Sequence, residues 1–268
     1  MSENPWRVVG HSLVKKYIDQ RLAAHSMPQA VLCVGPEGVG KRLLVRELAA
    51  RLGAADLEVM ECDCAAVTVQ ELRQFLDRMS LRPAQGTVQV ALFDHAEALT
   101  PAMANALLKT LEEPPAHGYF FLVSNQPNLL PTIASRCVQL RFGALLVQEC
   151  EEILGDAYKP AFATVVSQVG PGAFVRDPEF GLRAQAWNAE WQELVTASDF
   201  RRILLAQRLS AEEGPVLQQR LRVWLAQART AVVDVGYTRR ATVLQEALRR
   251  LARNANRKLV AEYVCLNV

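Results

Sequence analysis

The chain lacks any apolar run long enough to cross a membrane, and its N-terminal stretch "MSENPWRVVG" has no apolar core of the kind found in signal peptides. Its six cysteines do not follow the spacing of a disulfide framework. Internal repeats and low-complexity segments are also missing. These absences argue against a membrane protein and a disulfide-stapled secreted domain, and they predict free thiols in a cytoplasmic protein.

The composition is that of a folded globular protein, with 50% hydrophobic and 22% charged residues among 268. The net charge of +2 hides an uneven distribution. Residues 1–143 carry 14 basic and 14 acidic side chains, residues 144–180 carry 2 and 6, and residues 181–268 carry 14 and 8. The basic excess at the end fits solvated helix faces, which we favour, or a surface for nucleic acid or an acidic partner.

Strand-like and helix-like segments alternate through the first half of the chain. Short apolar runs predict five strands, at 29–35, 57–63, 88–94, 118–125 and 137–142. Helical spacing of apolar residues predicts helices between them. This alternation is typical of an α/β fold with a parallel five-stranded sheet.

The predicted helices carry terminal signals. The helix after the first strand has apolar residues at Leu43, Leu44, Leu48 and Leu52, and Gly53 suits its C-terminal end. Thr68 and Glu71 form a capping box for the next helix. Thr100 is the expected N-cap of a helix that begins with proline and stops at a Pro-Pro pair.

The pattern changes after residue 143. Residues 144–180 predict two or three short helices that end at a Gly-Pro-Gly break. Residues 181–268 predict three or four longer amphipathic helices, with 241–266 as one continuous stretch. The sequence therefore divides into segments 1–143, 144–180 and 181–268.

The stretch "GPEGVGKR" at residues 35–42 nearly matches the phosphate-binding pattern G-x-x-x-x-G-K-[ST], with Gly35, Gly40 and Lys41 in place. These glycines and Gly38 let the backbone turn its N–H groups toward phosphate oxygens, and Lys41 adds a positive charge at a helix start. The last position holds Arg42, whose guanidinium cannot coordinate Mg²⁺ as a hydroxyl does. A glycine-rich turn without nucleotide is the alternative, and the flanking strand and helix favour a phosphate loop.

Asp94 ends the apolar run "VALFD", where an acidic residue holds Mg²⁺ in related ATPases. The next residue in those enzymes is usually a carboxylate that orients the attacking water, and here it is His95. Arg42 and His95 thus alter two catalytic parts together. We expect a site that binds ATP and Mg²⁺ weakly or not at all and hydrolyses ATP poorly.

Arg136 lies in "TIASRC", just before the last predicted strand. It fits an ordinary surface arginine. It also fits an arginine that reaches the phosphates bound to the next subunit of an oligomeric ATPase, because a planar guanidinium remains charged and meets two oxygens at once.

Several segments together resemble the bacterial DNA polymerase III clamp loader of the AAA+ family: "GPEGVGK", "DHAEALT", "ANALLKTLEEPP", "PTIASRC" and "NANRKL". The chain looks most like the delta-prime subunit, because the gamma/tau motor subunit should have an intact phosphate loop and acidic motif. The resemblance covers nearly the full chain. It implies an AAA+ domain at 1–143, a small helical lid at 144–180 and a helical collar for oligomerisation at 181–268.

The resemblance also implies partners and residue roles. A delta-prime-like subunit joins the motor and delta subunits in a five-subunit ring, and meets the sliding clamp and primer-template DNA through that ring. Ser135, Arg136 and Cys137 match the family's Ser-Arg-Cys motif, so Arg136 would act in trans on a neighbour's ATP. Ser124 or Asn125 would sense the terminal phosphate. The segment expected near an adenine contains Pro5, Trp6, Val9 and Gly10.

Two departures from the family pattern affect cofactors. A structural zinc site needs four ligands, and only Cys62 and Cys64 follow the phosphate-loop helix, so we expect no zinc. The segment "GPGAFVR" offers only Arg176 as an ATP-sensing arginine of the lid.

Two other functions stay open. The chain could be an active gamma/tau-like ATPase that tolerates Arg42 and His95, which predicts saturable MgATP binding and turnover. It could also be an AAA+ adaptor in DNA repair, which would not require motor and delta subunits. We rank the clamp-loader subunit first.

Overall fold

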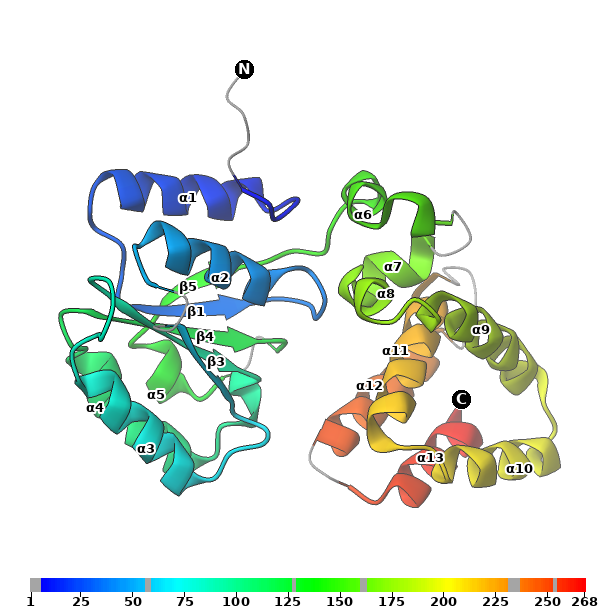
Figure 1. Cartoon of the computed structure of the whole chain (residues 1–268). Coiled ribbons are helices and arrows are strands. Elements are labelled where there is room, and N and C mark those ends of the chain that lie inside the picture. The colour runs from blue at the N-terminus through cyan, green and yellow to red at the C-terminus, as the bar shows by residue number, and fades with distance from the viewer. Residues whose placement is uncertain (1–5, 56–58, 127–128, 160–162, 231–236, 253–254) are drawn as a thin grey trace. The chain divides into compact units, whose positions relative to one another are not determined.

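The computed structural model describes residues 6–55, 59–126, 129–159, 163–230, 237–252 and 255–268. The chain forms two compact units, Met1–Leu145 and Leu146–Val268 (Figure 1). The predicted further division near residue 180 stays a prediction. Among the described residues, no helix is both long and apolar enough to span a membrane.

The first unit is built on a five-stranded parallel sheet, as predicted. Its strands are β1 (Ala30–Val34), β2 (Val59–Asp63), β3 (Gln89–Asp94), β4 (Gly118–Ser124) and β5 (Val138–Arg141). They lie in the order β2-β3-β4-β1-β5. All five strands point the same way, so their carboxyl ends share one edge of the sheet, where Asp63 pairs with Asp94 and Val34 with Ser124.

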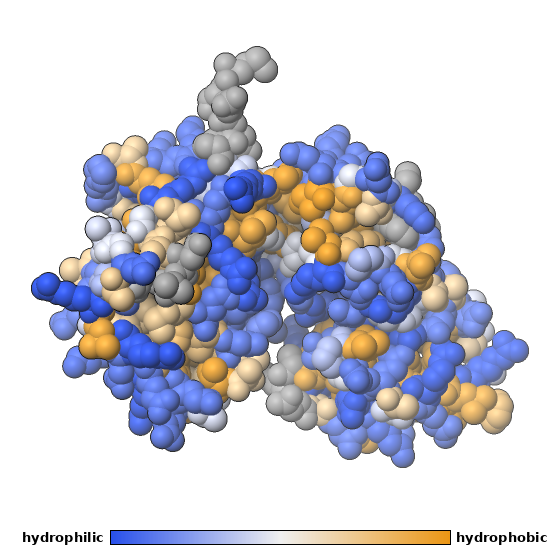
Figure 2. Space-filling view, in the orientation of Figure 1, coloured by the Kyte–Doolittle hydropathy of each residue, from blue (hydrophilic) through white to orange (hydrophobic). Residues whose placement is uncertain are grey.

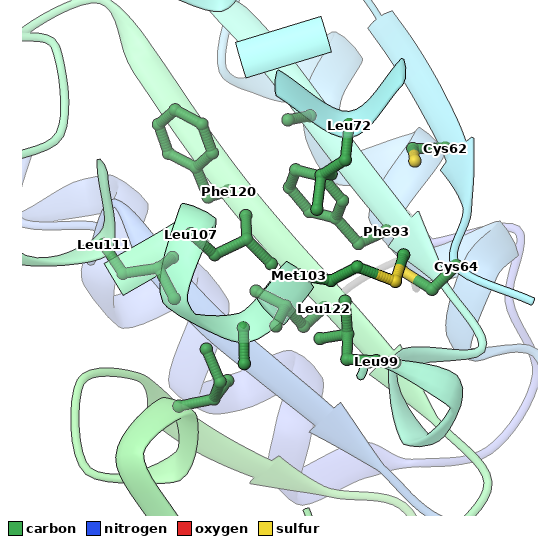
Figure 3. Packing of buried hydrophobic residues seen from close by; sticks show 14 of the residues in the cluster. Cys62, Cys64, Leu72, Phe93, Leu99, Met103, Leu107, Leu111, Phe120 and Leu122 are labelled. Carbon is green, nitrogen blue, oxygen red and sulfur yellow. The ribbon is translucent and has the colours of Figure 1, made fainter. Parts of the chain in front are cut away.

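Helices cover both faces of this sheet. Helices α1 (Ser12–Ala23) and α2 (Lys41–Arg51) lie on one face, and α3 (Val69–Ser80), α4 (Pro101–Glu112) and α5 (Pro131–Ala134) on the other. Side chains of β1, β3 and β4 form one buried cluster with those of α3 and α4. Figure 3 shows part of it, including Phe93, Met103 and Phe120. The three inner strands β1, β3 and β4 are buried on both sides, as expected for a parallel sheet covered by helices.

Most predicted helix ends are confirmed. Thr68 and Glu71 form the capping box of α3, Thr100 accepts the N–H of residue 103 at the start of α4, and Gly53 follows α2 with a φ of 87°. Among the apolar residues of α2, Leu43 is 53% exposed whereas Leu44 is buried. Neighbouring helical residues point about 100° apart, so only one of these two leucines can face the sheet.

The second unit is entirely helical in its described residues. Its helices are α6 (Val147–Leu154), η3 (Gly155–Ala157), α7 (Ala163–Val169), α8 (Gly172–Arg176), α9 (Phe180–Thr196), α10 (Asp199–Ser210), α11 (Gly214–Thr230), α12 (Tyr237–Ala252) and α13 (Arg257–Asn267). The single helix predicted over 241–266 is wrong. It divides into α12 and α13 because Asn256 caps α13, with its side-chain oxygen accepting the N–H of Lys258 at 2.9 Å.

A buried arginine joins α9 and α11 in the second unit. Arg220 of α11 is 7% exposed, forms ion pairs with Glu190 and Glu212, and lies against the rings of Trp187 and Trp224. The pairing of Arg220 offsets the cost of burying its charge.

The visible surface in Figure 2 is mostly hydrophilic, with apolar side chains gathered over α6–α8.

Candidate functional site

The loop between β1 and α2 has the backbone of a phosphate loop. Gly38 and Gly40 adopt left-handed φ angles of 76° and 96°, which glycine adopts without strain, and Gly40 is the N-cap of α2. A Cβ added at Gly35 would lie 2.3 Å from the carbonyl oxygen of Phe142. The predicted loop glycines therefore lie together at the carboxyl edge of the sheet, and Gly35 is held there by close packing.

Lys41, the first residue of α2, is turned into its own loop. Its Nζ donates hydrogen bonds to the carbonyl oxygens of Gly35, at 2.8 Å, and Pro36. A third bond goes to Oδ1 of Asn125 at 2.9 Å. The side chain is buried, and burial lowers the pKa of its amine from 10.5 to about 8, against the opposing effect of nearby carboxylates. An ammonium has three protons, and three protein oxygens accept them.

Asn125 follows β4 and connects Lys41 with an acidic residue. Its Nδ2 and backbone N–H donate to the two carboxylate oxygens of Glu97, each at 3.1 Å. Ser124 is fully buried, and its hydroxyl donates to the carbonyl oxygen of Gln126 at 2.8 Å. Of the two predicted sensors, Asn125 is therefore the one in contact with the loop lysine.

Arg42 contacts the first two strands in the sheet order, β2 and β3. Its guanidinium forms an ion pair with Glu61 of β2, and its Nη1 lies 3.4 Å from Oδ2 of Asp94 at the end of β3. Arg46, one turn later on α2, also contacts Glu61, at 2.5 Å. These contacts lower the pKa of Glu61, with the hydrogen bond from Arg46 as the largest cause. The residue in the hydroxyl position thus pairs with the predicted Mg²⁺ ligand.

His95 is turned toward the neighbouring strand. Its Nδ1 lies 2.9 Å from Oδ1 of Asp63, and its backbone has a left-handed φ of 50°. Burial lowers the pKa of the imidazole, but the hydrogen bond with Asp63 and the surrounding carboxylates outweigh burial and raise the pKa above 6.5. A residue so paired differs from the free carboxylate expected there in an ATPase.

The N-terminal segment packs against α1 and α2. The indole N–H of Trp6 donates to Asp19 at 3.1 Å, and the guanidinium of Arg51 lies 3.8 Å from the centre of the Trp6 ring. Glu47 of α2 accepts the backbone N–H groups of Arg7 and Val8. Trp6 is buried, whereas Val9 and Gly10 are half-buried. Pro5 lies outside the described residues.

Arg136 lies at the amino ends of the strands, the edge of the sheet opposite the carboxyl ends where the phosphate loop lies. It precedes β5, whose first residue Val138 pairs with Val31 near the start of β1. The carboxyl end of β1 is three residues further on, roughly 10 Å along the strand. The guanidinium of Arg136 forms an ion pair with Glu112 at the end of α4, and its Nη1 donates to the carbonyl oxygen of Thr132 at 2.8 Å. Arg136 and its exposed neighbour Ser135 are therefore remote from this chain's own phosphate loop.

Three comparisons relate the chain to known proteins. A family model described as "DNA polymerase III, delta subunit" matches residues 51–145. The DNA polymerase III subunit tau of Salmonella typhimurium is 34% identical over 196 residues, which cover 62% of this chain and 30% of that protein. The DNA polymerase III subunit delta-prime of Yersinia pestis is 49% identical over 74 residues, 27% of this chain and 22% of that protein. Over these stretches the chain is similar to subunits of DNA polymerase III.

A solved structure has a similar fold. The DNA polymerase III gamma subunit-related protein of Thermotoga maritima superposes with a TM-score of 0.54 at 18% identity, covering 93% of this chain and 97% of that one. At this identity the likeness concerns the fold alone. The chain spans less than half of the first curated relatives, with 30% of two tau subunits and 48% of a gamma subunit.

The remaining predicted residues are placed as follows. Arg176 lies at the end of α8 in the second unit, where its Nε donates to the carbonyl oxygen of Gly172. Cys62 and Cys64 are buried in the core between the sheet and α3–α4 (Figure 3). Within the described part of the chain, no three His, Cys, Asp or Glu side chains are grouped to hold a metal ion. The absence of zinc stays a prediction.

Two functional neighbours were not singled out by the sequence. Glu61 pairs with Arg42, and Glu97 holds Asn125. Glu61 lies within the predicted second strand, where a charged residue in an apolar run signals a specific partner. Glu97 is part of the quoted "DHAEALT" motif, but its contact with residue 125 depends on β3 and β4 being neighbours.

Proposed function

We propose that this chain is a delta-prime-like, cytoplasmic subunit of a DNA polymerase III clamp loader. It helps a five-subunit ring of motor and delta subunits load the sliding clamp onto primed DNA, and it contacts clamp and DNA through the assembled ring. The observation that carries the proposal is the position of Arg136, at the sheet edge opposite the chain's own phosphate loop. An arginine placed there serves a neighbour's nucleotide better than its own.

Arg136 has the chemistry for this role. Its side chain is 31% exposed, and its guanidinium contacts Glu112, Thr132 and Ser135. A guanidinium that meets the terminal phosphate of a neighbouring subunit stabilises the charge of the transition state, an effect of roughly 10³–10⁵ in rate for arginine fingers.

The chain's own nucleotide site is proposed to be weak or empty. Lys41 donates its hydrogen bonds to oxygen atoms of the protein, and Asp94 is paired with Arg42. His95 pairs with Asp63 in place of a free carboxylate. These contacts support a subunit whose ATPase activity is lost, and whose contribution to the ring is Arg136 and its interfaces.

The test is ATP hydrolysis by a ring reconstituted with motor and delta subunits, stimulated by clamp and primed DNA. Arg136→Ala should lower turnover while the ring still assembles, as followed by size-exclusion chromatography. Arg141→Ala is the matched control, because Arg141 is an exposed arginine of β5 that contacts only Gln139 in the described hydrogen bonds of its side chain. Equal turnover with both variants would remove the trans role of Arg136.

A second candidate, an active ATPase of the gamma/tau type, is favoured by one arrangement. Lys41, Asp94 and Asn125 occupy the positions at the carboxyl edge that such a site uses. This candidate predicts saturable MgATP binding and steady turnover by the isolated chain, both abolished by Lys41→Met. Turnover at the level of a motor subunit would establish it.

A further inference from the structure

The carboxyl edge of the sheet contains a compact set of charges at the phosphate loop. Arg42 and Arg46 come from α2, Glu61 from β2 and Asp94 from β3. The guanidinium of Arg42 faces both carboxylates, whereas that of Arg46 faces Glu61 alone. Glu61 and Asp94 have side chains only 24% and 19% exposed, whereas Arg42 covers them with a side chain that is 49% exposed.

These residues do not fit a magnesium ion. Mg²⁺ requires nearly ideal octahedral oxygen coordination, usually one or two carboxylates together with substrate phosphates and water. Asp94 has both oxygens engaged, because Oδ1 accepts the backbone N–H of His95 at 3.0 Å and Oδ2 faces Nη1 of Arg42. The hydroxyl ligand that the pattern expects at position 42 is absent. A cation that entered would meet the positive charge of Arg42 directly.

The loop itself is closed by internal bonds in the same region. The Lys41 ammonium donates its three hydrogen bonds to oxygen atoms of Gly35, Pro36 and Asn125. A phosphate would have to break at least one of these bonds to bind Lys41. The lysine contact therefore opposes nucleotide entry independently of Arg42.

We propose that Arg42 is a built-in counter-cation that takes the place of Mg²⁺ and closes this phosphate loop to MgATP. The inference deepens the proposed function, since it rests on the assignment of a weak or empty site and names the residue that keeps it so. Replacing Arg42 by serine removes the positive charge from Asp94 and supplies the missing hydroxyl oxygen. The carboxylate then carries an uncompensated charge that Mg²⁺ neutralises when it arrives with ATP.

The experiment measures ATP binding to the isolated full chain by isothermal titration, with Mg²⁺ and again with EDTA. Arg42→Ser should bind MgATP at least about tenfold more tightly than the unmodified chain, and EDTA should abolish the gain. Arg46→Ser is the matched control, because it removes the other arginine that contacts Glu61. Among the described ion pairs, Arg46 has no contact with Asp94. The affinity of this variant for MgATP should therefore equal that of the unmodified chain. Circular dichroism checks that each variant is folded, and Arg42→Thr supplies the same hydroxyl should the serine variant unfold.

Two outcomes would overturn the proposal. In the first, the folded Arg42→Ser and Arg42→Thr chains bind MgATP no better than the unmodified chain. In the second, the unmodified chain already binds ATP with full dependence on Mg²⁺. Neither outcome bears on Arg136, because the titration uses no ring, whereas the turnover test of the proposed function depends on the ring and not on Arg42.

Discussion

We expect close packing against Phe142 to require a glycine at position 35 of the phosphate loop, whether or not a nucleotide binds. An alanine Cβ at this position would lie 2.3 Å from the carbonyl oxygen and 2.7 Å from the Cβ of Phe142. Phe142 cannot withdraw easily, because its N–H donates to Val34 at 2.7 Å and its ring packs edge-to-face on His11. Overpacking of this kind destabilises a protein by roughly 1–3 kcal/mol.

The assay is native-state hydrogen exchange of the β1 and β5 amides, which report the opening of the first unit. Gly35→Ala should speed their exchange by roughly 5- to 150-fold, the equivalent of about 1–3 kcal/mol. Gly143→Ala is the matched control, since a Cβ there meets nothing within 4 Å. It should leave exchange unchanged or slow it slightly, because alanine loses less entropy on folding.

One result would refute this reasoning. If the two alanine variants show equal protection of β1 and β5, then the first unit absorbs the added methyl group at Gly35 without cost. The loop would then be soft at this point. The close approach of Gly35 to Phe142 could no longer be offered as the reason for a glycine there.

Three further outcomes are expected. Glu112→Gln should lower the free energy of unfolding by no more than about 1 kcal/mol in urea titrations, because its ion pair with Arg136 is half exposed. Arg220→Met should cost roughly 3–5 kcal/mol, followed by tryptophan fluorescence in urea, because it leaves two carboxylates without their buried partner. His95 should titrate above 6.5 by NMR, and Asp63→Asn should lower its pKa. The stabilisation from that pair is fully present below pH 6.5 and is lost as pH rises through the folded-state pKa.

The secondary structure of the first unit could be predicted because its determinants are local. Apolar runs of strand length, a capping box and a proline at a helix start each act within a few residues. The prediction failed where a local pattern was ambiguous. Leu43 and Leu44 both fit a helical stripe, and the exposure of Leu43 follows from which face α2 turns to the sheet. Asn256 is a cap, but it lies inside a stretch that reads as one amphipathic helix.

The charge pattern of the candidate site could not be predicted, because it depends on strand order. Arg42 meets Glu61 and Asp94 only because β2 and β3 are neighbours at the edge of the sheet. The sequence identified the loss of a hydroxyl at position 42, and from that a weak metal site. It did not show that the guanidinium of Arg42 pairs with the carboxylate of Asp94, nor that Oδ1 of Asn125 accepts a hydrogen bond from Lys41. Such contacts join residues far apart in the chain.

Arg42 and Arg136 allow a final prediction. Arg42 lies near the carboxyl end of β3, and Arg136 lies at the amino end of β5, on the opposite side of the same sheet. Residues that far apart with no shared partner usually act additively. In the reconstituted ring, Arg136→Ala should lower turnover and Arg42→Ser should leave it unchanged. The double variant should therefore match Arg136→Ala, even if serine restores MgATP binding, since His95 remains paired with Asp63 and no free carboxylate is present to orient water. If the double variant instead recovers turnover, this chain hydrolyses its own ATP once Arg42 is gone, and Arg42 alone had silenced an otherwise competent motor.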